Sequence, residues 1–250
     1  NCGACDTNCV FCDGTTCLQH LDVTVVKTSG EQETSVSTGC GQTQLTLSHA
    51  LTAGGDLEHD YRLLVLGLGF QANSSNGTPC EVSYGAQNFT RVTDLAASDG
   101  TVGYIYIMKE DKIRAATNDS LVVRINEHSS YGIIAAQLLE LTGVDQVNPT
   151  NGAYQTTNTS FTLNPSSGDG LSVGDSGSLV YSLMARRSAE PTASFRTFYQ
   201  SIRDARVGAG HFMADDDDAQ STITWGGGGF SHKLSAISVQ RAVNVCQTGC

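Results

Sequence analysis

The feature that most constrains this chain is a long succession of short, strand-like segments with almost no helical pattern between them. The segments are rich in Val, Ile, Leu, Tyr and Thr, which fit a pleated surface, and clusters of Gly, Asn, Asp and Ser separate them. Apolar and polar residues alternate in Tyr104–Ile107 and in Leu234–Val239. The expected strands are Leu21–Lys27, Gln44–Leu51, Arg62–Phe70, Glu81–Tyr84, Gln87–Thr93, Val102–Lys109, Ser120–Ile125, Gly132–Thr142, Thr159–Leu163, Ser178–Arg186, Ala193–Ser201, Gly208–Met213, Ser221–Trp225 and Lys233–Val243.

This pattern predicts an all-β fold. Two runs, Leu63–Phe70 and Ile133–Leu141, are almost continuously apolar, which is typical of central strands covered on both faces. Only Asp111–Ala116 has a helical pattern, and no strand–helix alternation occurs. We therefore expect a two-sheet, jelly-roll-like β-sandwich with a disulfide-rich N-terminal segment.

The expected domain organisation has three parts. Residues 1–41 form a Cys-rich segment and linker that could act as an inter-subunit arm, and the linker-like part is Thr28–Gly41. Residues 42–245 form the β-sandwich domain, and 246–250 form a Cys-containing tail.

Nine cysteines, distributed very unevenly, point to an oxidising compartment. The N-terminal segment that carries five of them has almost no apolar side chains, so disulfides are expected to hold it. The Cys-x-x-Cys pairs also fit metal knuckles, but zinc ribbons separate their pairs by about 15–20 residues. An odd total leaves at least one cysteine free or bonded to another molecule, such as a second chain. The expected disulfide cysteines are Cys2, Cys5, Cys9, Cys12, Cys17, Cys40, Cys80, Cys246 and Cys250.

Charge narrows the range of partners. The 250 residues carry 14 basic and 25 acidic side chains, a formal net charge of −11. Such a surface repels phosphate backbones and anionic lipids, so binding to nucleic acid is not expected. Membrane insertion is not expected either, because no apolar run reaches the ~20 residues of a membrane span.

Two further features fit a secreted protein. The chain begins Asn1–Cys2 without Met or an apolar targeting segment, so we expect a processed N-terminus and an extracellular or cell-surface location. Five Asn-x-Ser/Thr sequons are candidates for glycosylation, namely Asn73, Asn76, Asn88, Asn118 and Asn158.

Several stretches follow one recognisable order along about residues 45–243. A strand at Leu45–His49 leads through a Thr-Ala-Gly turn into Arg62–Leu68, and a hairpin at Val82–Val92 follows. A strand at Tyr104–Tyr106, a segment ending in Thr142–Gln146 and a final strand at Leu234–Val243 complete the order. This order resembles a β-sandwich module of secreted and surface bacterial proteins. The resemblance implies a structural or binding unit without a common catalytic site, and the Cys-rich head lies outside it.

One motif suggests catalysis. Gly174–Ser178 resembles the nucleophile loop of trypsin-like serine proteases, with Ser176 as the nucleophile. That chemistry also needs a His base and a buried Asp, and the contexts of His49 and His59 do not match those of the protease family. We expect a turn leading into the strand at Ser178.

No other motif predicts a cofactor. Asp215, Asp216, Asp217 and Asp218 are expected to form a solvated loop and are a weak calcium candidate. The histidines lack metal-ligand spacing, so no metal or cofactor is expected. Gly226–Gly229 is expected to be a hairpin connection, because no helix-forming sequence follows it.

These features together favour a non-enzymatic extracellular structural protein. We expect it to self-associate into a surface filament or coat, held by strand addition and disulfides. The alternatives are a secreted carbohydrate-binding or adhesive module with a glycan partner, and a secreted hydrolase that uses Ser176.

Overall fold

The protein consists almost entirely of β-structure. The computed structural model describes residues 11–12, 17–21, 23–33, 35–36, 43–52, 61–71, 78–93, 101–126, 134–174, 177–187, 189–202, 205–214, 222–226 and 232–246. These residues form five sheets and one short helix. The expected all-β class is therefore confirmed.

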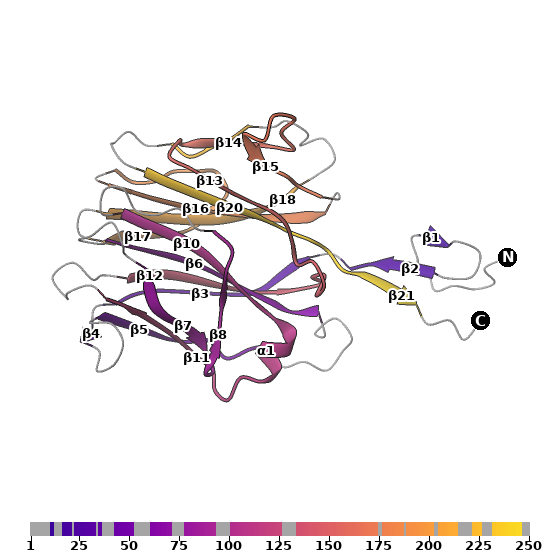
Figure 1. Ribbon diagram of the computed structural model, residues 1–250, viewed down its shortest axis with the longest axis horizontal. Coiled ribbons are helices and arrows are strands. Elements are labelled where there is room, and N and C mark those ends of the chain that lie inside the picture. The colour runs from indigo at the N-terminus through magenta and orange to yellow at the C-terminus, as the bar shows by residue number, and fades with distance from the viewer. Residues whose placement is uncertain are drawn as a thin grey trace.

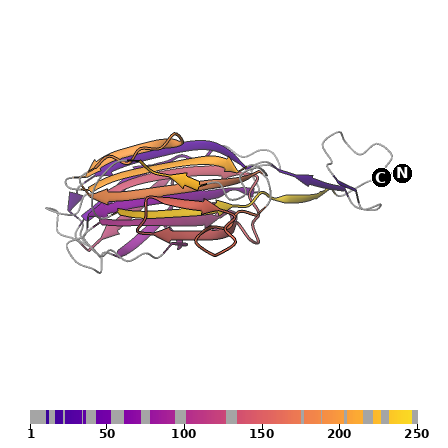
Figure 2. The same ribbon diagram turned by 90° about the horizontal axis from the view of Figure 1, so that it is seen from above.

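Four of the sheets lie face to face in a stack, and a ribbon of strands extends beyond one end of it (Figures 1 and 2). We name the stacked layers the outer, middle, far and cap sheets, and the projecting ribbon the stem. Among the described residues, strand pairs are antiparallel except β14–β15 in the cap sheet, which joins Ser160–Leu163 to Gly170–Leu171.

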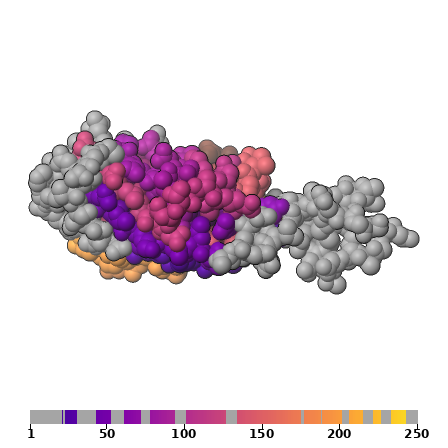
Figure 3. All heavy atoms as spheres, turned by 90° about the horizontal axis from the view of Figure 1, so that it is seen from below, coloured from indigo at the N-terminus to yellow at the C-terminus, as the bar shows by residue number. Residues whose placement is uncertain are grey.

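The outer sheet forms one face of the molecule, which Figure 3 shows as seen from below. It contains, in order, β4 (Ser35–Val36), β5 (Thr43–Ser48), β11 (Ser120–Ile125), β7 (Pro79–Tyr84) and β8 (Gln87–Asn88). Strand β5 alternates buried and partly or fully exposed residues, because one of its faces meets solvent.

The middle sheet is covered on both faces. It contains, in order, β3 (Thr24–Glu33), β12 (Ile134–Thr142), β6 (Leu63–Gln71), β10 (Thr101–Lys109) and β9 (Thr90–Arg91). Every residue of β12 is buried, as are the first eight of β6. The prediction that these two apolar runs are central strands is confirmed.

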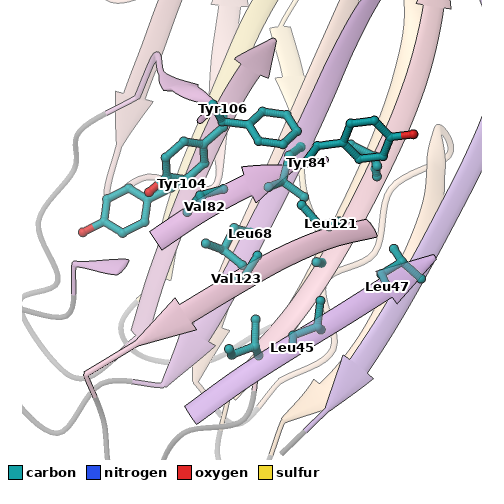
Figure 4. Close-up of a cluster of buried hydrophobic side chains, with 14 of the residues drawn as sticks. Leu45, Leu47, Leu68, Val82, Tyr84, Tyr104, Tyr106, Leu121 and Val123 are labelled. Carbon is teal, nitrogen blue, oxygen red and sulfur yellow. The ribbon is translucent and has the colours of Figure 1, made fainter. Parts of the chain in front are cut away.

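Hydrophobic side chains fill the space between the outer and middle sheets. Leu45 and Leu47 of β5 meet Leu68 of β6 and the aromatic rings of β10 in one cluster (Figure 4). Fully burying one such Leu contributes about 1.5–3 kcal/mol. The other labelled members of the cluster are Val82, Tyr84, Tyr104, Tyr106, Leu121 and Val123.

The far sheet packs on the opposite face of the middle sheet. It contains, in order, β13 (Thr150–Thr156), β20 (His232–Val239), β16 (Ser178–Arg187), β18 (Ala205–Ala214) and β17 (Arg196–Ile202). Alternate residues of the middle strands point here, so Leu63 and Val65 of β6 join Tyr181 and Leu183 of β16 in a second core.

Two glycines of β6 allow the middle and far sheets to pack closely against each other. A Cβ added to Gly67 would lie 2.0 Å from the hydroxyl oxygen of Tyr181, and one added to Gly69 would lie 2.5 Å from Val207. The Tyr181 hydroxyl crosses this gap and donates a hydrogen bond to Oε1 of Gln137 at 3.1 Å.

The cap sheet closes the other side of the far sheet. It contains β15 (Gly170–Leu171), β14 (Ser160–Leu163) and β19 (Thr222–Thr224). The single tryptophan, Trp225, is buried beneath it and donates from Nε1 to Oγ of Ser182 at 2.9 Å. A third core therefore separates these two sheets.

The structure differs from the expected fold in its number of sheets and in several strand boundaries. The stack contains more than two sheets, because β16 and β20 are buried on both faces as well as β6 and β12. The expected linker at Thr28–Gly41 is wrong in its first part, since β3 continues to Glu33 and pairs with β12. Strand β13 was not expected, because its polar sequence lacks apolar alternation. The helical segment is α1 (Glu110–Arg114), close to the predicted one.

Candidate functional site

The stem brings the two ends of the described chain together. Strand β1 (Phe11–Cys12) pairs with β2 (Cys17–His20), and β2 pairs with β21 (Val243–Cys246). Figures 1 and 2 show β2 and β21 side by side beyond the end of the stacked sheets. The pairing continues into the body, where the Leu21 amide donates to the Ala242 carbonyl at 3.0 Å.

The register of the stem places cysteines opposite one another. Cys17 lies opposite Cys12 on one side and opposite Cys246 on the other. The predicted Cys-containing tail is therefore partly a strand, and it pairs with the Cys-rich segment from the other end of the chain. Of the other predicted disulfide cysteines, Cys80 lies on β7. Cys2, Cys5, Cys9, Cys40 and Cys250 lie outside the described residues.

A second candidate site is a buried row of a hydroxyl, an imidazole and a carboxylate between the outer and middle sheets. Nδ1 of His49 lies 2.8 Å from Oγ of Ser29 on β3, and Nε2 lies 3.8 Å from Oε2 of Glu140 on β12. The side chains of His49 and Glu140 are wholly buried. Thr52 holds the carboxylate, because its backbone N–H donates to Oε2 at 3.0 Å and its hydroxyl donates at 3.1 Å.

The environment of His49 makes it a weak base. Burial and, to a smaller extent, the charge of Lys27 lower the pKa of His49 to about 4, although Asp119 acts in the opposite direction. A general base is most effective with a pKa near the working pH, so an imidazole with a pKa this low activates a hydroxyl poorly at neutral pH. This row resembles a catalytic triad in its groups, but its burial and its pKa favour a structural cross-link between layers.

A carboxylate with two arginines forms a third polar cluster at the start of α1. Glu110 accepts from Nε and Nη2 of Arg62 at 2.9 and 2.8 Å, and from Nε of Arg114 at 2.8 Å. The hydrogen bond to Glu110 raises the pKa of Arg62. Gln146 completes the cluster, since its Oε1 accepts from the Glu110 amide and its Nε2 donates to the Arg62 carbonyl.

A cavity of about 550 Å³ lies beside this cluster, lined by Lys109, Glu110, Asp111, Arg114 and Gln146. Most of its polar groups already bind one another. Lys109 donates to the Gln146 carbonyl at 2.9 Å, for example, so the cluster joins α1 to the loop after β12.

An open groove of about 460 Å³ lies where the chain crosses from β8 to β9. Its lining includes Glu81, Asn88, Arg91 and Tyr106. Tyr106 is buried, and the Arg91 guanidinium lies 5.2 Å from the ring centre of Tyr104. The groove therefore offers a cation, a carboxylate and an amide, with an aromatic side chain below them.

The remaining predicted site residues are either exposed on the surface or lie outside the described residues. The sequon residues Asn88, Asn118 and Asn158 are exposed, so a glycan has room at each. Ser176, and the weak calcium candidates Asp215, Asp216, Asp217 and Asp218, lie outside the described residues, as do Asn73 and Asn76. Among the described residues, no group of three or more His, Cys, Asp or Glu side chains is arranged to hold a metal ion.

The row of Ser29, His49 and Glu140 could not be predicted from the sequence as a unit. Its members lie far apart in the sequence on β3, after β5 and on β12, so no local motif connects them. One signal was available, because Glu140 is the one charged residue of the mostly apolar run Ile133–Leu141.

Comparison with known proteins gives no relative. No protein-family model, curated protein or solved structure matches this chain. In the part of the chain that the structure describes, no helix has the length and apolarity needed to cross a bilayer.

Proposed function

We propose that this protein is a non-enzymatic structural subunit of the cell exterior that self-associates into a filament or coat. The observation that carries the proposal is the stem, where strands from both ends of the chain meet outside the body and bear cysteines at matched positions. The resemblance to a β-sandwich module of secreted and surface proteins is consistent with this assignment.

The body suits a structural role. Three hydrophobic cores separate four stacked sheets, and the central strands β6, β10, β12, β16 and β20 are buried on both faces. Close packing of this kind gives a rigid interior that resists deformation.

The edge strand β3 is the candidate for strand addition. It is ten residues long, and β12 is its only partner strand among the described residues. Thr24, Thr28 and Gly30 are exposed along it. A long strand edge of this kind can accept another chain through main-chain hydrogen bonds.

The test of this function is the assembly state of the purified, unreduced protein. Non-reducing electrophoresis should show a ladder that collapses to one band on reduction, and negative-stain electron microscopy should show polymers before reduction. A single monomeric band without reductant, together with monodisperse particles, would refute self-assembly.

A glycan-binding or adhesive module is the second candidate, and the groove beside β8 and β9 favours it. Arg91, Glu81 and Asn88 offer the hydrogen-bonding groups that a sugar hydroxyl needs. A glycan array should give hits that Arg91→Ala abolishes, with Arg114→Ala as the control variant on the other cavity. An array without hits would remove this candidate.

A further inference from the structure

One row of cysteines crosses the whole stem. Cys12, Cys17 and Cys246 occupy the same register position on β1, β2 and β21. Residues directly opposite one another in antiparallel strands lie on the same face of the sheet. The row therefore places Cys17 between two other cysteines, one from each end of the described chain.

Both neighbours are within bonding reach of Cys17. Opposed Cα atoms of antiparallel strands lie about 4.5–5.5 Å apart, and disulfides span Cα separations of about 4.4–6.8 Å. Cys17 can bond only one of the two. The pairing of β2 with β21 extends over four residue pairs and continues into the body through Leu21 and Ala242, whereas β1 pairs with β2 over two.

Chain entropy also favours a bond from Cys17 to Cys246 over a bond from Cys17 to Cys12. A bond between Cys17 and Cys246 closes a ring around nearly the whole chain, whereas a bond between Cys12 and Cys17 closes a loop of a few residues. The larger ring restricts the unfolded chain more and so stabilises the folded state more.

We propose that Cys17 and Cys246 form a disulfide that clasps the two ends of the body together, so that tension applied to the chain termini bypasses the stacked sheets. Two thiols lose two protons and two electrons to an extracellular oxidant such as a protein disulfide or molecular oxygen, and one S–S bond forms. The clasp itself does not depend on self-assembly, whereas its role under tension rests on the proposed function. A subunit linked to its neighbours through residues beyond the clasp would transmit load without unfolding.

Peptide mapping tests the clasp. Cleavage of the unreduced protein after Lys and Arg and before Asp gives the peptides 13–21, with Cys17 as its only cysteine, and 242–250. We expect these two peptides to be linked, with fragmentation placing the bond on Cys246 rather than Cys250. Linkage of Cys17 to any other cysteine in the wild-type protein would overturn the proposal, and so would bound zinc detected by elemental analysis.

Two variants check the register. In Cys12→Ser the link between 13–21 and 242–250 should persist. In Cys246→Ser, Cys17 should shift to Cys12 and link 13–21 to the peptide 6–12. If Cys17 formed a disulfide with neither Cys246 nor Cys12 in these variants, the three cysteines would not lie in one row.

Single-molecule pulling tests the mechanical role. With handles that contain no thiol fused to both termini of the full chain, the oxidised protein should show no unfolding of the body. After reduction it should lengthen by roughly 750 Å, since each released residue spans about 3.3–3.6 Å. Cys17→Ser without reductant should also unfold, up to this length. Cys12→Ser is the matched control and should behave as wild type. Full extension of the oxidised wild type would refute the clasp, whatever the electrophoresis ladder shows about assembly.

Discussion

Buried His49 should make this protein lose stability in mild acid. The folded protein holds the imidazole between Ser29 and Glu140 with a pKa of about 4, against 6.5 for the ordinary group. Between these two values the unfolded chain binds a proton on this residue that the folded chain does not bind. The free energy of unfolding therefore falls as the pH falls through this window, and this contribution is fully present only above about pH 6.5.

The size of the effect follows from the two pKa values. One unit of pKa shift corresponds to about 1.4 kcal/mol, so the loss on going from about pH 7.5 to below pH 4 is about 3 kcal/mol. Urea unfolding at several pH values, followed by Trp225 fluorescence, measures it. The variant His49→Gln removes the titration, so the free-energy difference between wild type and variant should shrink by this amount as the pH falls.

The matched control is His211→Gln. Burial also lowers the pKa of His211, which is half-buried, so this variant should show a weaker change in the same direction. A difference between wild type and His49→Gln that stays constant from about pH 7.5 to 4 would refute the reasoning. A wild type that becomes relatively more stable in acid would show instead that Glu140 stabilises a charged imidazole.

Three further predictions concern packing and ion pairs. Gly67→Ala should lower the free energy of unfolding in urea by about 1–3 kcal/mol, because its Cβ would overlap the Tyr181 hydroxyl. Gly103→Ala should lower it less, since the nearest atom to its Cβ would be the small Cβ of Ala185 at 3.2 Å. Glu110→Gln should lower the free energy of unfolding, measured by heat or urea, by about 3 kcal/mol, because it leaves the mostly buried Arg62 without its carboxylate. Arg114→Ala should lower it by under about 1 kcal/mol, because the Arg114 side chain is 56% exposed. Trp225 fluorescence should be blue-shifted and resistant to iodide quenching in the folded protein, and emission typical of an exposed indole would contradict its burial beneath the cap sheet.

The strands that lie inside the body were predictable because their signal is local. Ser120–Ile125 was expected with the bounds that the structure has, and Leu63–Phe70 was expected to be covered on both faces. A strand repeats its side-chain direction every two residues, so apolar content and alternation report burial directly. Polar strands gave no such signal, and for this reason Thr150–Thr156 was not found.

The candidate sites were less predictable, because they depend on which segments meet. The sequence pointed to His49 only as an isolated residue, and Ser29 fell in a stretch interpreted as a linker. The strand order of the middle sheet places β3 beside β12, and this pairing brings Ser29 and Glu140 to the same interlayer space.

The amino-acid sequence by itself determined an acidic, all-β chain with cysteines gathered at its ends, because composition and two-residue periodicity are properties of short segments. Only the tertiary structure decided that the sheets stack four deep and that Cys17 lies opposite Cys246. An apolar strand face must be covered, but any apolar surface of matching shape can cover it. The choice among them is made by contacts between segments far apart in the chain, such as Gly67 against Tyr181, where a missing side chain in one sheet makes room for a ring from the next.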